Sequence, residues 1–216
     1  MKKHILLAVF ALVFLPACEW LRGVEGSGVI VEEKREVKDF HSLRISGGYE
    51  LAVAVGPEES LIIKGDDNLL PLITTVVEDG VLILKSKKAI SPKSPIRLTV
   101  SAKTLKSLKL SGSAAGAVTG LQTPEFAVAC SGSCRLTLSG KADVLDIDVS
   151  GSGKIDAAAL PATSARVDIS GSGEADLTVS ESLKVKISGS GTVRYAGAPK
   201  VEQSVSGSGR IVQVSK

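Results

Sequence analysis

Apolar and polar residues follow a repeating order in the second half of the chain. The order is built around six copies of the motif Ser-Gly-Ser, which are 18 to 20 residues apart and begin at Ser111, Ser131, Ser150, Ser170, Ser188 and Ser206. The residue just before each motif is apolar, the residue three before it is apolar except at Gln203, and the residue between them is mostly polar. This alternation is typical of a β-strand with one buried face. Each copy therefore predicts one strand that runs into a corner.

The regular spacing of the copies predicts how these strands are arranged. A unit that recurs about every 19 residues indicates a solenoid, in which equivalent residues of successive coils stack and form a continuous core. We therefore expect an all-β fold, a right-handed parallel β-helix with regular coils from about residue 105 and irregular N-terminal β coils before them. Glycine permits the positive φ that tight corners need, so structural corners are expected at Gly112, Gly132, Gly151, Gly171, Gly189 and Gly207.

The segment from Gly26 to about Val100 also has the pattern of β-structure. Alternation of apolar and polar residues predicts strands over 49–55, 61–63 and 96–100. Asp79-Gly80 lies between two apolar runs and predicts a two-residue hairpin turn. Residues 69–72 are expected to form a single helical turn at most, because Pro71 has no amide donor.

The first 25 residues have the order of a bacterial lipoprotein precursor. A short basic start is followed by an apolar run from Ile5 to Leu15, too short to span a bilayer, and then by a small residue before a cysteine. We expect residues 1–17 to be a signal peptide, Cys18 to be lipidated, and residues 18–25 to be a tether to a folded domain over 26–216. The membrane would then be a partner, and Glu19 in place of an aspartate favours the outer membrane of a bacterial cell envelope. An ordinary secretory signal with an incidental cysteine is the alternative.

The charge balance argues against a nucleic-acid partner. Removal of residues 1–17 takes Lys2 and Lys3 away and leaves 24 basic against 23 acidic residues. Phosphate binding depends on clustered Lys and Arg, which this balance gives no reason to expect. Aromatic residues make up only 3% of the chain, which also weakens any interpretation as a stacking platform for bases or sugar rings.

Cys130 and Cys134 flank the second Ser-Gly-Ser corner. A disulfide across this turn suits an oxidising envelope compartment. Cys130 also stands in an apolar column, however, where a free thiol packs as a small hydrophobe. Both states remain open at this point.

Two pairs of aspartates fall in matching columns of adjacent coils, Asp148 with Asp168 and Asp156 with Asp176. Stacked carboxylates can bind calcium or serve as acid and base in enzymes that cleave polysaccharides. They can also be solvated residues of the outer face, which is favoured here because basic residues continue both columns.

The sequence predicts no catalytic residue, no metal site and no cofactor. His41 is the one histidine left after signal removal, which argues against a histidine triad and a multi-histidine metal site. The six glycine-rich corners are not followed by a helical pattern, so they do not predict phosphate-binding loops.

The order of several motifs resembles a family of bacterial proteins described as autotransporter-adhesin heads with a head GIN domain. The resemblance covers nearly all of 26–216 and rests on the recurring corners together with Asp39–Gly47, Gly65–Leu69, Glu78–Leu82 and Leu105–Gly112. It implies a β-helical fold, often carried on a lipoprotein, and no established activity.

These observations predict a non-enzymatic envelope lipoprotein that acts as a rigid structural, adhesion or interaction module, with an envelope protein or a glycan as its partner. The alternative is a protein that binds or cleaves polysaccharides through a groove in which acidic residues meet a Lys or Arg. Self-association through unpaired end coils is a further expectation, because no capping segment is evident after residues 211–214.

Overall fold

The structure is a computed structural model that describes residues 23–215. Within this range the chain is almost entirely β-structure, with a single short 3-10 turn. The elements are β1 (Val24–Glu25), β2 (Ile30–Arg35), β3 (Ser42–Ser46), β4 (Tyr49–Val55), β5 (Ser60–Asp66), η2 (Leu70–Leu72), β6 (Ile73–Glu78), β7 (Val81–Ser86), β8 (Ile90–Ser91), β9 (Arg97–Ala102), β10 (Ser107–Gly151), β11 (Lys154–Gly171), β12 (Glu174–Gly189), β13 (Thr192–Ala196), β14 (Lys200–Gly207) and β15 (Arg210–Gln213). The predicted all-β class is confirmed. The predicted signal peptide 1–17 and the lipidation site Cys18 lie outside the described residues.

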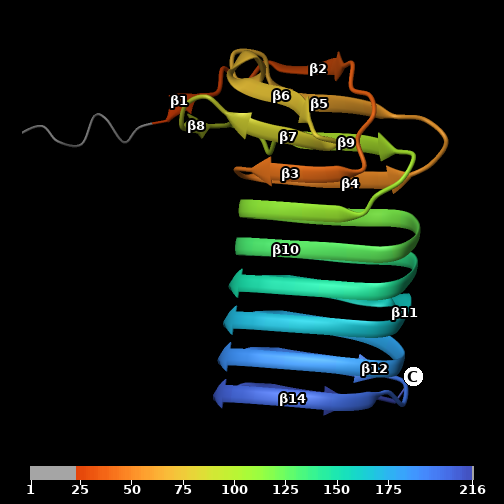
Figure 1. Ribbon diagram of the computed structural model, residues 1–216. Helices are drawn as coiled ribbons and strands as arrows, with labels where there is room; N and C mark the ends of the chain where they lie inside the picture. The colour runs from red at the N-terminus through yellow and green to blue at the C-terminus, as the bar shows by residue number, and fades with distance from the viewer. Residues whose placement is uncertain (1–22, 216) are drawn as a thin grey trace, which may run out of the picture.

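The repeat region forms a stack of chain turns that pair with one another in parallel (Figure 1). Gly151 of β10 lies opposite Gly171 of β11, which lies opposite Gly189 of β12, which lies opposite Gly207 of β14. We call each turn of chain around one corner a rung and name it by its corner glycine. The sequence repeat therefore corresponds to one rung, and the corners stack as their spacing predicts.

Parallel pairing begins earlier than residue 105, where the regular coils were expected to start. Strands β3 and β4 pair with β10 in the register Ser46 opposite Ser111 and Tyr49 opposite Ala114. On their other side, β3 pairs in parallel with β7, and β4 pairs in parallel with β9. The stack therefore includes most of the segment that the sequence assigns to irregular coils.

The order of the upper rungs in space differs from their order along the chain. The rung of β7 and β9 lies above the rung of β3 and β4, although it follows it in sequence. Above and beside it, β2 pairs with β5, β5 with β9, and β6 with β7, all antiparallel. We call β2, β5, η2 and β6 the cap (Figure 1).

The two local predictions for the cap region are confirmed. β6 and β7 form the antiparallel hairpin, and its turn residues Asp79 and Gly80 have φ values of 49° and 73°. Both central residues of a type I′ turn need positive φ, which Asp and Gly tolerate best. The segment with Pro71 forms only the single turn η2.

The interior of the stack is filled by aliphatic side chains that lie above one another. One inward column consists of buried residues from successive rungs: Leu43, Leu108, Val128, Ile147, Val167 and Val185. Each such side chain contributes roughly 1.5–3 kcal/mol by leaving water. The core therefore continues from the cap to the lower rungs without interruption, as one cluster of buried residues.

The last rung has no further rung below it within residues 23–215. β14 pairs only with β12, and β15 pairs only with β13. Its side chains are mostly exposed, including Val205 and Val212 at 42% each. Gln203, the one exception to the apolar column, belongs to this rung and lies below Val185. The polar exception in the repeat thus marks the open end of the stack.

The chain enters the fold at the same end as the cap. β1 pairs in parallel with β8, with Val24 opposite Ile90. Val24 and Glu25, the last residues of the predicted tether of 18–25, therefore form part of a two-stranded sheet, and residues 18–22 lie outside the described range. Within residues 23–215 no helix is long and apolar enough to cross a membrane.

Candidate functional surfaces

The corners form one continuous column along the stack. All six predicted corner glycines have positive φ, between 110° and 125°. A Cβ atom on any one of them would lie 2.5–2.7 Å from the carbonyl oxygen of the corner glycine in the rung above. The N–H of the serine that follows the corner also donates to that oxygen, for example from Ser172 to Gly151 at 2.9 Å. The column thus requires glycine for both its backbone conformation and its close approach.

The column has a seventh member that the sequence interpretation missed. Gly47 has a φ of 134°, and its carbonyl oxygen is the atom that a Cβ on Gly112 would meet at 2.7 Å. Ser46-Gly47-Gly48 escaped notice because it lies 65 residues before the Gly112 corner instead of about 19. The dipeptide Ser46-Gly47 matches the first two residues of the Ser-Gly-Ser motif, and this match was the signal that could have identified the seventh corner.

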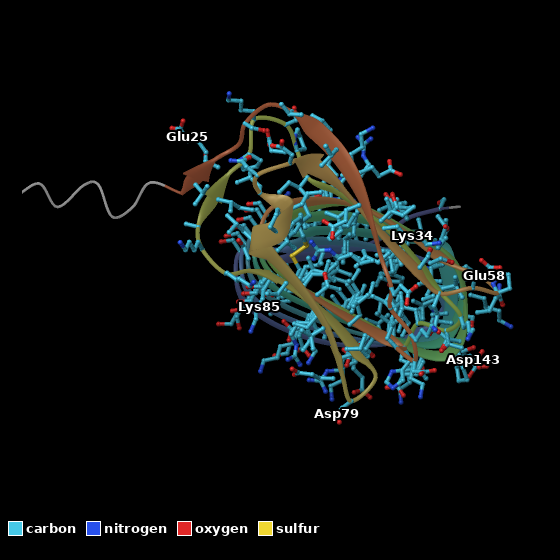
Figure 2. The ribbon with its side chains drawn as sticks, turned by 90° about the horizontal axis from the view of Figure 1, so that it is seen from above. Glu25, Lys34, Glu58, Asp79, Lys85 and Asp143 are labelled. Atoms are coloured by element: carbon cyan, nitrogen blue, oxygen red, sulfur yellow. A yellow bond between two sulfur atoms is a disulfide. The ribbon has the colours of Figure 1, made fainter. Side chains whose placement is uncertain are left out.

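The Gly132 rung carries the two cysteines of the folded part. A disulfide joins Cys130 and Cys134 in the structure, and their Cα atoms lie 6.3 Å apart, which suits such a bond. Figure 2 shows the disulfide inside the outline of the stack, and both residues are buried. A Cβ on Gly153 in the next rung would lie 2.9 Å from both sulfur atoms. The sulfur atoms thus occupy the space that aliphatic side chains such as Val149 and Ile169 occupy in later rungs. Oxidation of the pair in the cell stays a prediction.

One outer face carries the first pair of predicted aspartates together with basic residues. Asp148 lies opposite Asp168, which lies opposite Lys186 in the next rung. Arg166 Nε donates to Asp168 Oδ2 at 2.7 Å. These four residues line a shallow hollow of about 320 Å³. The structure therefore brings together two carboxylates, an arginine and a lysine on one surface.

Burial and neighbouring charges set the pKa values on this face. Partial burial raises the pKa of Asp146, and the neighbouring carboxylates of Asp168 and Asp148 act in the same direction against the attraction of Arg166. The hydrogen bond to Asp168 and the charge of that carboxylate raise the pKa of Arg166. The face therefore holds a carboxyl group whose ionisation is disfavoured next to a permanently charged guanidinium.

On the opposite outer face, an arginine pairs with one member of the second predicted pair of aspartates, Asp176. Asp156 lies opposite Asp176, and Arg194 in the next rung donates to Asp176 Oδ1 and to Glu174 Oε2, both at 2.7 Å. Lys154 Nζ lies 3.4 Å from the same Glu174 carboxylate. Asp176 and Glu174 are thus members of an ion-pair ladder that connects neighbouring rungs, whereas within residues 23–215 Asp156 accepts only the Ala158 N–H, at 3.1 Å.

In the part of the chain that the structure describes, no group of three or more His, Cys, Asp or Glu side chains is placed to hold a metal ion. His41 Nδ1 lies 3.1 Å from Ser42 Oγ at the edge of the cap. Tyr49 is buried, and burial raises its pKa.

A buried carboxylate holds the entering chain onto the cap. Asp66 is fully buried, and its two oxygens accept the N–H groups of Gly28 at 2.6 Å and of Lys93 at 3.1 Å. The next residues continue the clasp, since Asp67 accepts the Ser27 hydroxyl and Asn68 accepts the Ser27 N–H. The sequence predicts only a turn here, because a local motif does not show that its carboxylate faces a segment about 40 residues away.

The sequence profile of one protein family, described as "Putative auto-transporter adhesin, head GIN domain", matches residues 39–199. No curated protein matches the chain. Among solved structures, a "putative adhesin" from Bacteroides fragilis is 21% identical, with a TM-score of 0.69, and the match covers 89% of this chain and 100% of that one. A "putative lipid binding protein" from Parabacteroides distasonis is 20% identical, with a TM-score of 0.59 and the same two coverages.

A third similar structure, a "putative adhesin" from Parabacteroides merdae, is 20% identical with a TM-score of 0.50 and covers 89% of this chain and 99% of its own. At these identities the structures show a shared fold. The family profile covers most of the repeat region and most of the cap. The matched range includes all four sequence segments that resemble this family, from Asp39–Gly47 to Leu105–Gly112. The chain belongs to the head GIN domain family of autotransporter-adhesin-like proteins.

Proposed function

We propose that this protein is a non-enzymatic lipoprotein of the bacterial cell envelope, in which a right-handed parallel β-helix acts as a rigid adhesion or interaction module. Membership in an adhesin-like family supports an interaction role. The parallel register and the stacked corner glycines support the β-helical form.

One observation carries the proposal. The chain enters the fold beside the cap, and the last rung lies at the opposite end of a continuous hydrogen-bonded stack (Figure 1). A protein held at its N-terminus would therefore present the outer faces of its rungs and its last rung away from the attachment point. Because each rung is bonded to the next through strands and corners, the stack resists bending and can act as a spacer.

Attachment through a lipid on Cys18 is the second part of the proposal. Cys18→Ser is expected to abolish acyl labelling and to release the protein from the membrane fraction. Unchanged fractionation of that variant would contradict the lipoprotein assignment. The outer membrane is the proposed site, and sucrose-gradient separation of the two membranes tests it.

Oriented attachment tests the interaction function. The protein is fixed to a surface by its N-terminus or, as the matched control, by its C-terminus, and each surface is exposed to envelope fragments and to intact cells. We expect stronger capture with N-terminal attachment, since this orientation leaves the last rung and the faces free. Equal absence of capture in both orientations would contradict an interaction module.

The hollow beside Asp148 favours polysaccharide binding as the second candidate function, because carboxylates there meet Arg166 and Lys186 in one groove. Arg166→Ala should weaken binding to an envelope polysaccharide if the hollow is used, whereas Arg194→Ala on the opposite face should not. Cleavage of that polysaccharide by the wild-type protein would replace the non-enzymatic proposal.

We also propose that a second copy pairs with the last rung. The outer edges of β14 and β15 have no strand partner within residues 23–215, and unpaired edges are templates for further pairing. Light scattering at several concentrations should show dimers that Val205→Lys weakens. A strictly monomeric wild-type protein would contradict this contact.

A further inference from the structure

Four lysines gather where the chain enters the fold: Lys85, Lys87, Lys88 and Lys93, which we call the lysine patch. All four are exposed, and no acidic residue occurs between Lys85 and Lys93. None of the four takes part in a salt bridge within residues 23–215. Lys85 and Lys88 line the same hollow of about 500 Å³, together with Ile90, Pro92 and several serines and glycines.

The patch and the N-terminal segment are fixed to each other by direct contacts. The Val24 N–H donates to the Ala89 carbonyl at 2.8 Å, and the Gly26 N–H donates to the Ser91 carbonyl at 2.9 Å. Lys93 Nζ donates to the Ser27 carbonyl at 3.1 Å. Figure 2 shows Lys85 on the same side of the molecule as Glu25, and Glu58 and Asp143 lie on the other side. The patch therefore lies at the point from which any N-terminal anchor extends.

Hydrogen bonds already engage the nearest acidic side chains of the clasp. Asp66 is buried and accepts two backbone N–H groups, and Asp67 accepts the Ser27 hydroxyl and the Asn68 N–H. Glu25, opposite Ser91, is exposed and reduces the positive charge by one. Accepting hydrogen bonds from N–H and O–H groups does not cancel the charge of a carboxylate, and Asp67 is exposed like Glu25. The four lysines therefore exceed Glu25, Asp66 and Asp67 by one charge. The excess lies at Lys85, Lys87 and Lys88, because Lys93 is the lysine that contacts Asp66 and Ser27.

We propose that the lysine patch binds the anionic phospholipid surface of the membrane to which the protein is anchored. This inference rests on the proposed anchoring through Cys18. From Cys18 to Val24 the chain can reach roughly 20 Å at most when extended, so the patch cannot move far from the lipid. The electrostatic field of an anionic bilayer decays over about 8–10 Å at moderate ionic strength. A tether this short keeps the lysine patch close enough to the bilayer to come within that distance.

Binding of the lysine patch to the membrane would add to the anchoring through the lipid. Lipid chains hold a protein to a bilayer, and a basic patch next to them is a common additional signal for stable anchoring. The patch would also fix the orientation of the molecule, with the cap close to the membrane and the last rung away from it.

Vesicle binding tests the proposal without the lipid. A chain that begins at residue 19 contains the whole described fold, and the similar solved chains consist almost entirely of this shared fold, so the part tested folds on its own. Its partitioning is measured onto vesicles that contain phosphatidylglycerol and onto pure phosphatidylcholine vesicles, at low and at high salt. We expect binding to the anionic vesicles alone, and weaker binding at high salt.

Charge variants identify the surface that binds. Neutralising Lys85, Lys87, Lys88 and Lys93 to Gln should reduce partitioning at least about tenfold, since each lysine near an anionic surface contributes up to about fivefold. The matched control neutralises four exposed lysines of the stack, Lys106, Lys141, Lys184 and Lys200, and should retain most of the binding. A triple variant that keeps Lys93, and thus its bond to Ser27, guards against damage to the clasp.

Equal losses in the patch variant and the control variant would overturn the proposal, as would wild-type binding that is the same on both kinds of vesicle. Acyl labelling of Cys18 in the full chain is scored separately. A chain that is acylated but whose patch is inert on vesicles overturns the lysine patch alone, whereas a chain that binds vesicles but is not acylated overturns the lipoprotein assignment alone.

Discussion

The two ends of the stack are completed in different ways. At the N-terminal end, antiparallel strands cover the uppermost rung, and Leu61 and Ile63 of β5 are fully buried beneath them. At the other end, β14 and β15 have no strand partner on their lower edges within residues 23–215, and Val205 is 42% exposed. Repeat arrays need terminal units that shield the core, and in the part of the chain that the structure describes one end has a cap of antiparallel strands and the other does not. The open end relies on polar substitutions instead, because Gln203 and Gln213 stand in columns that are apolar above them.

The difference indicates a division of roles. The cap also holds the entering chain through Asp66, and it lies beside the lysine patch, so this end is built for attachment. The open end keeps unsatisfied strand edges that a partner can complete. Equivalent changes should therefore cost much more stability near the cap or within the stack than in the last rung.

The corner column should give the largest contrast. Gly171→Ala introduces a Cβ at 2.5 Å from the Gly151 carbonyl oxygen and forces alanine to a φ of 119°, so we expect a loss of about 3 kcal/mol or more. Gly207→Ala makes the same clash with Gly189 in the last rung, where the chain can detach, and should cost about 1 kcal/mol. Chemical denaturation measures both, with the exposed Ser170→Ala as the control. Equal costs for the two glycines would contradict the comparison.

Core truncation should give the next contrast. Ile63→Ala removes a fully buried side chain from the cap and should cost about 2–5 kcal/mol. Val205→Ala removes a half-exposed side chain from the last rung and should cost less than about 0.5 kcal/mol. Thermal unfolding of the two variants under the same conditions checks this. A loss at Val205 as large as that at Ile63 would mean that the last rung is covered in solution.

The disulfide in the Gly132 rung should have an intermediate effect. Its cysteines are only four residues apart, and closing so short a loop contributes about 2 kcal/mol. We expect reduction to lower stability by that amount. The double variant Cys130→Val and Cys134→Ala copies residues that neighbouring rungs have at these columns, Val149 and Ala114, and should fold with a similar loss. Two thiols that alkylate freely without a reductant would show that the bond does not form.

Two carboxyl groups should make small pH-dependent contributions of opposite sign. Burial of Glu59 alone would raise its pKa, but the N–H groups of Asp39 and Phe40 and the charge of Lys103 outweigh this and lower it. Glu59 therefore stabilises the fold above its ordinary pKa, and this stability is lost as the pH falls through the lowered value. Asp146 has a raised pKa, so its stabilising effect is complete at acid pH and is lost as the pH rises through that value.

At pH 7, Glu59→Gln should therefore lower the melting temperature and Asp146→Asn should raise it slightly. Both differences should shrink as the pH falls and should vanish once the carboxyl groups are protonated in the folded and unfolded states, which for Glu59 requires a pH below its lowered pKa. Melting curves over this range provide the measurement. A stabilising effect of Glu59→Gln at neutral pH would contradict the contribution of the hydrogen bonds to the cap.

The sequence allowed the repeat region to be predicted because the repeat itself sets its register. Every corner glycine meets the corner of the preceding rung, so a fixed spacing of 18–20 residues is enough to align the columns. The hairpin at Asp79-Gly80 was equally accessible, because its turn chemistry is local.

The upper rungs could not be predicted in the same way. The Gly47 rung is separated from the Gly112 rung by residues that build the rung above it and most of the cap, so the spacing that identifies a repeat is lost. The clasp at Asp66 and the pairing of Val24 with Ile90 depend on contacts between distant segments, which no periodicity encodes. In the sequence the charged hollow was visible as a column of two aspartates that Lys186 continues, whereas the contribution of Arg166, which stands outside this column, depends on the stacking.

Amide hydrogen exchange, resolved strand by strand, tests the difference between the two ends most directly. In dilute, monomeric protein we expect the slowest exchange in β5, β9, β11 and β12, and exchange that is faster by orders of magnitude in β14 and β15, whose edges are open. Protection of β14 and β15 equal to that of β12 under these conditions would contradict a stack that is capped at one end and open at the other.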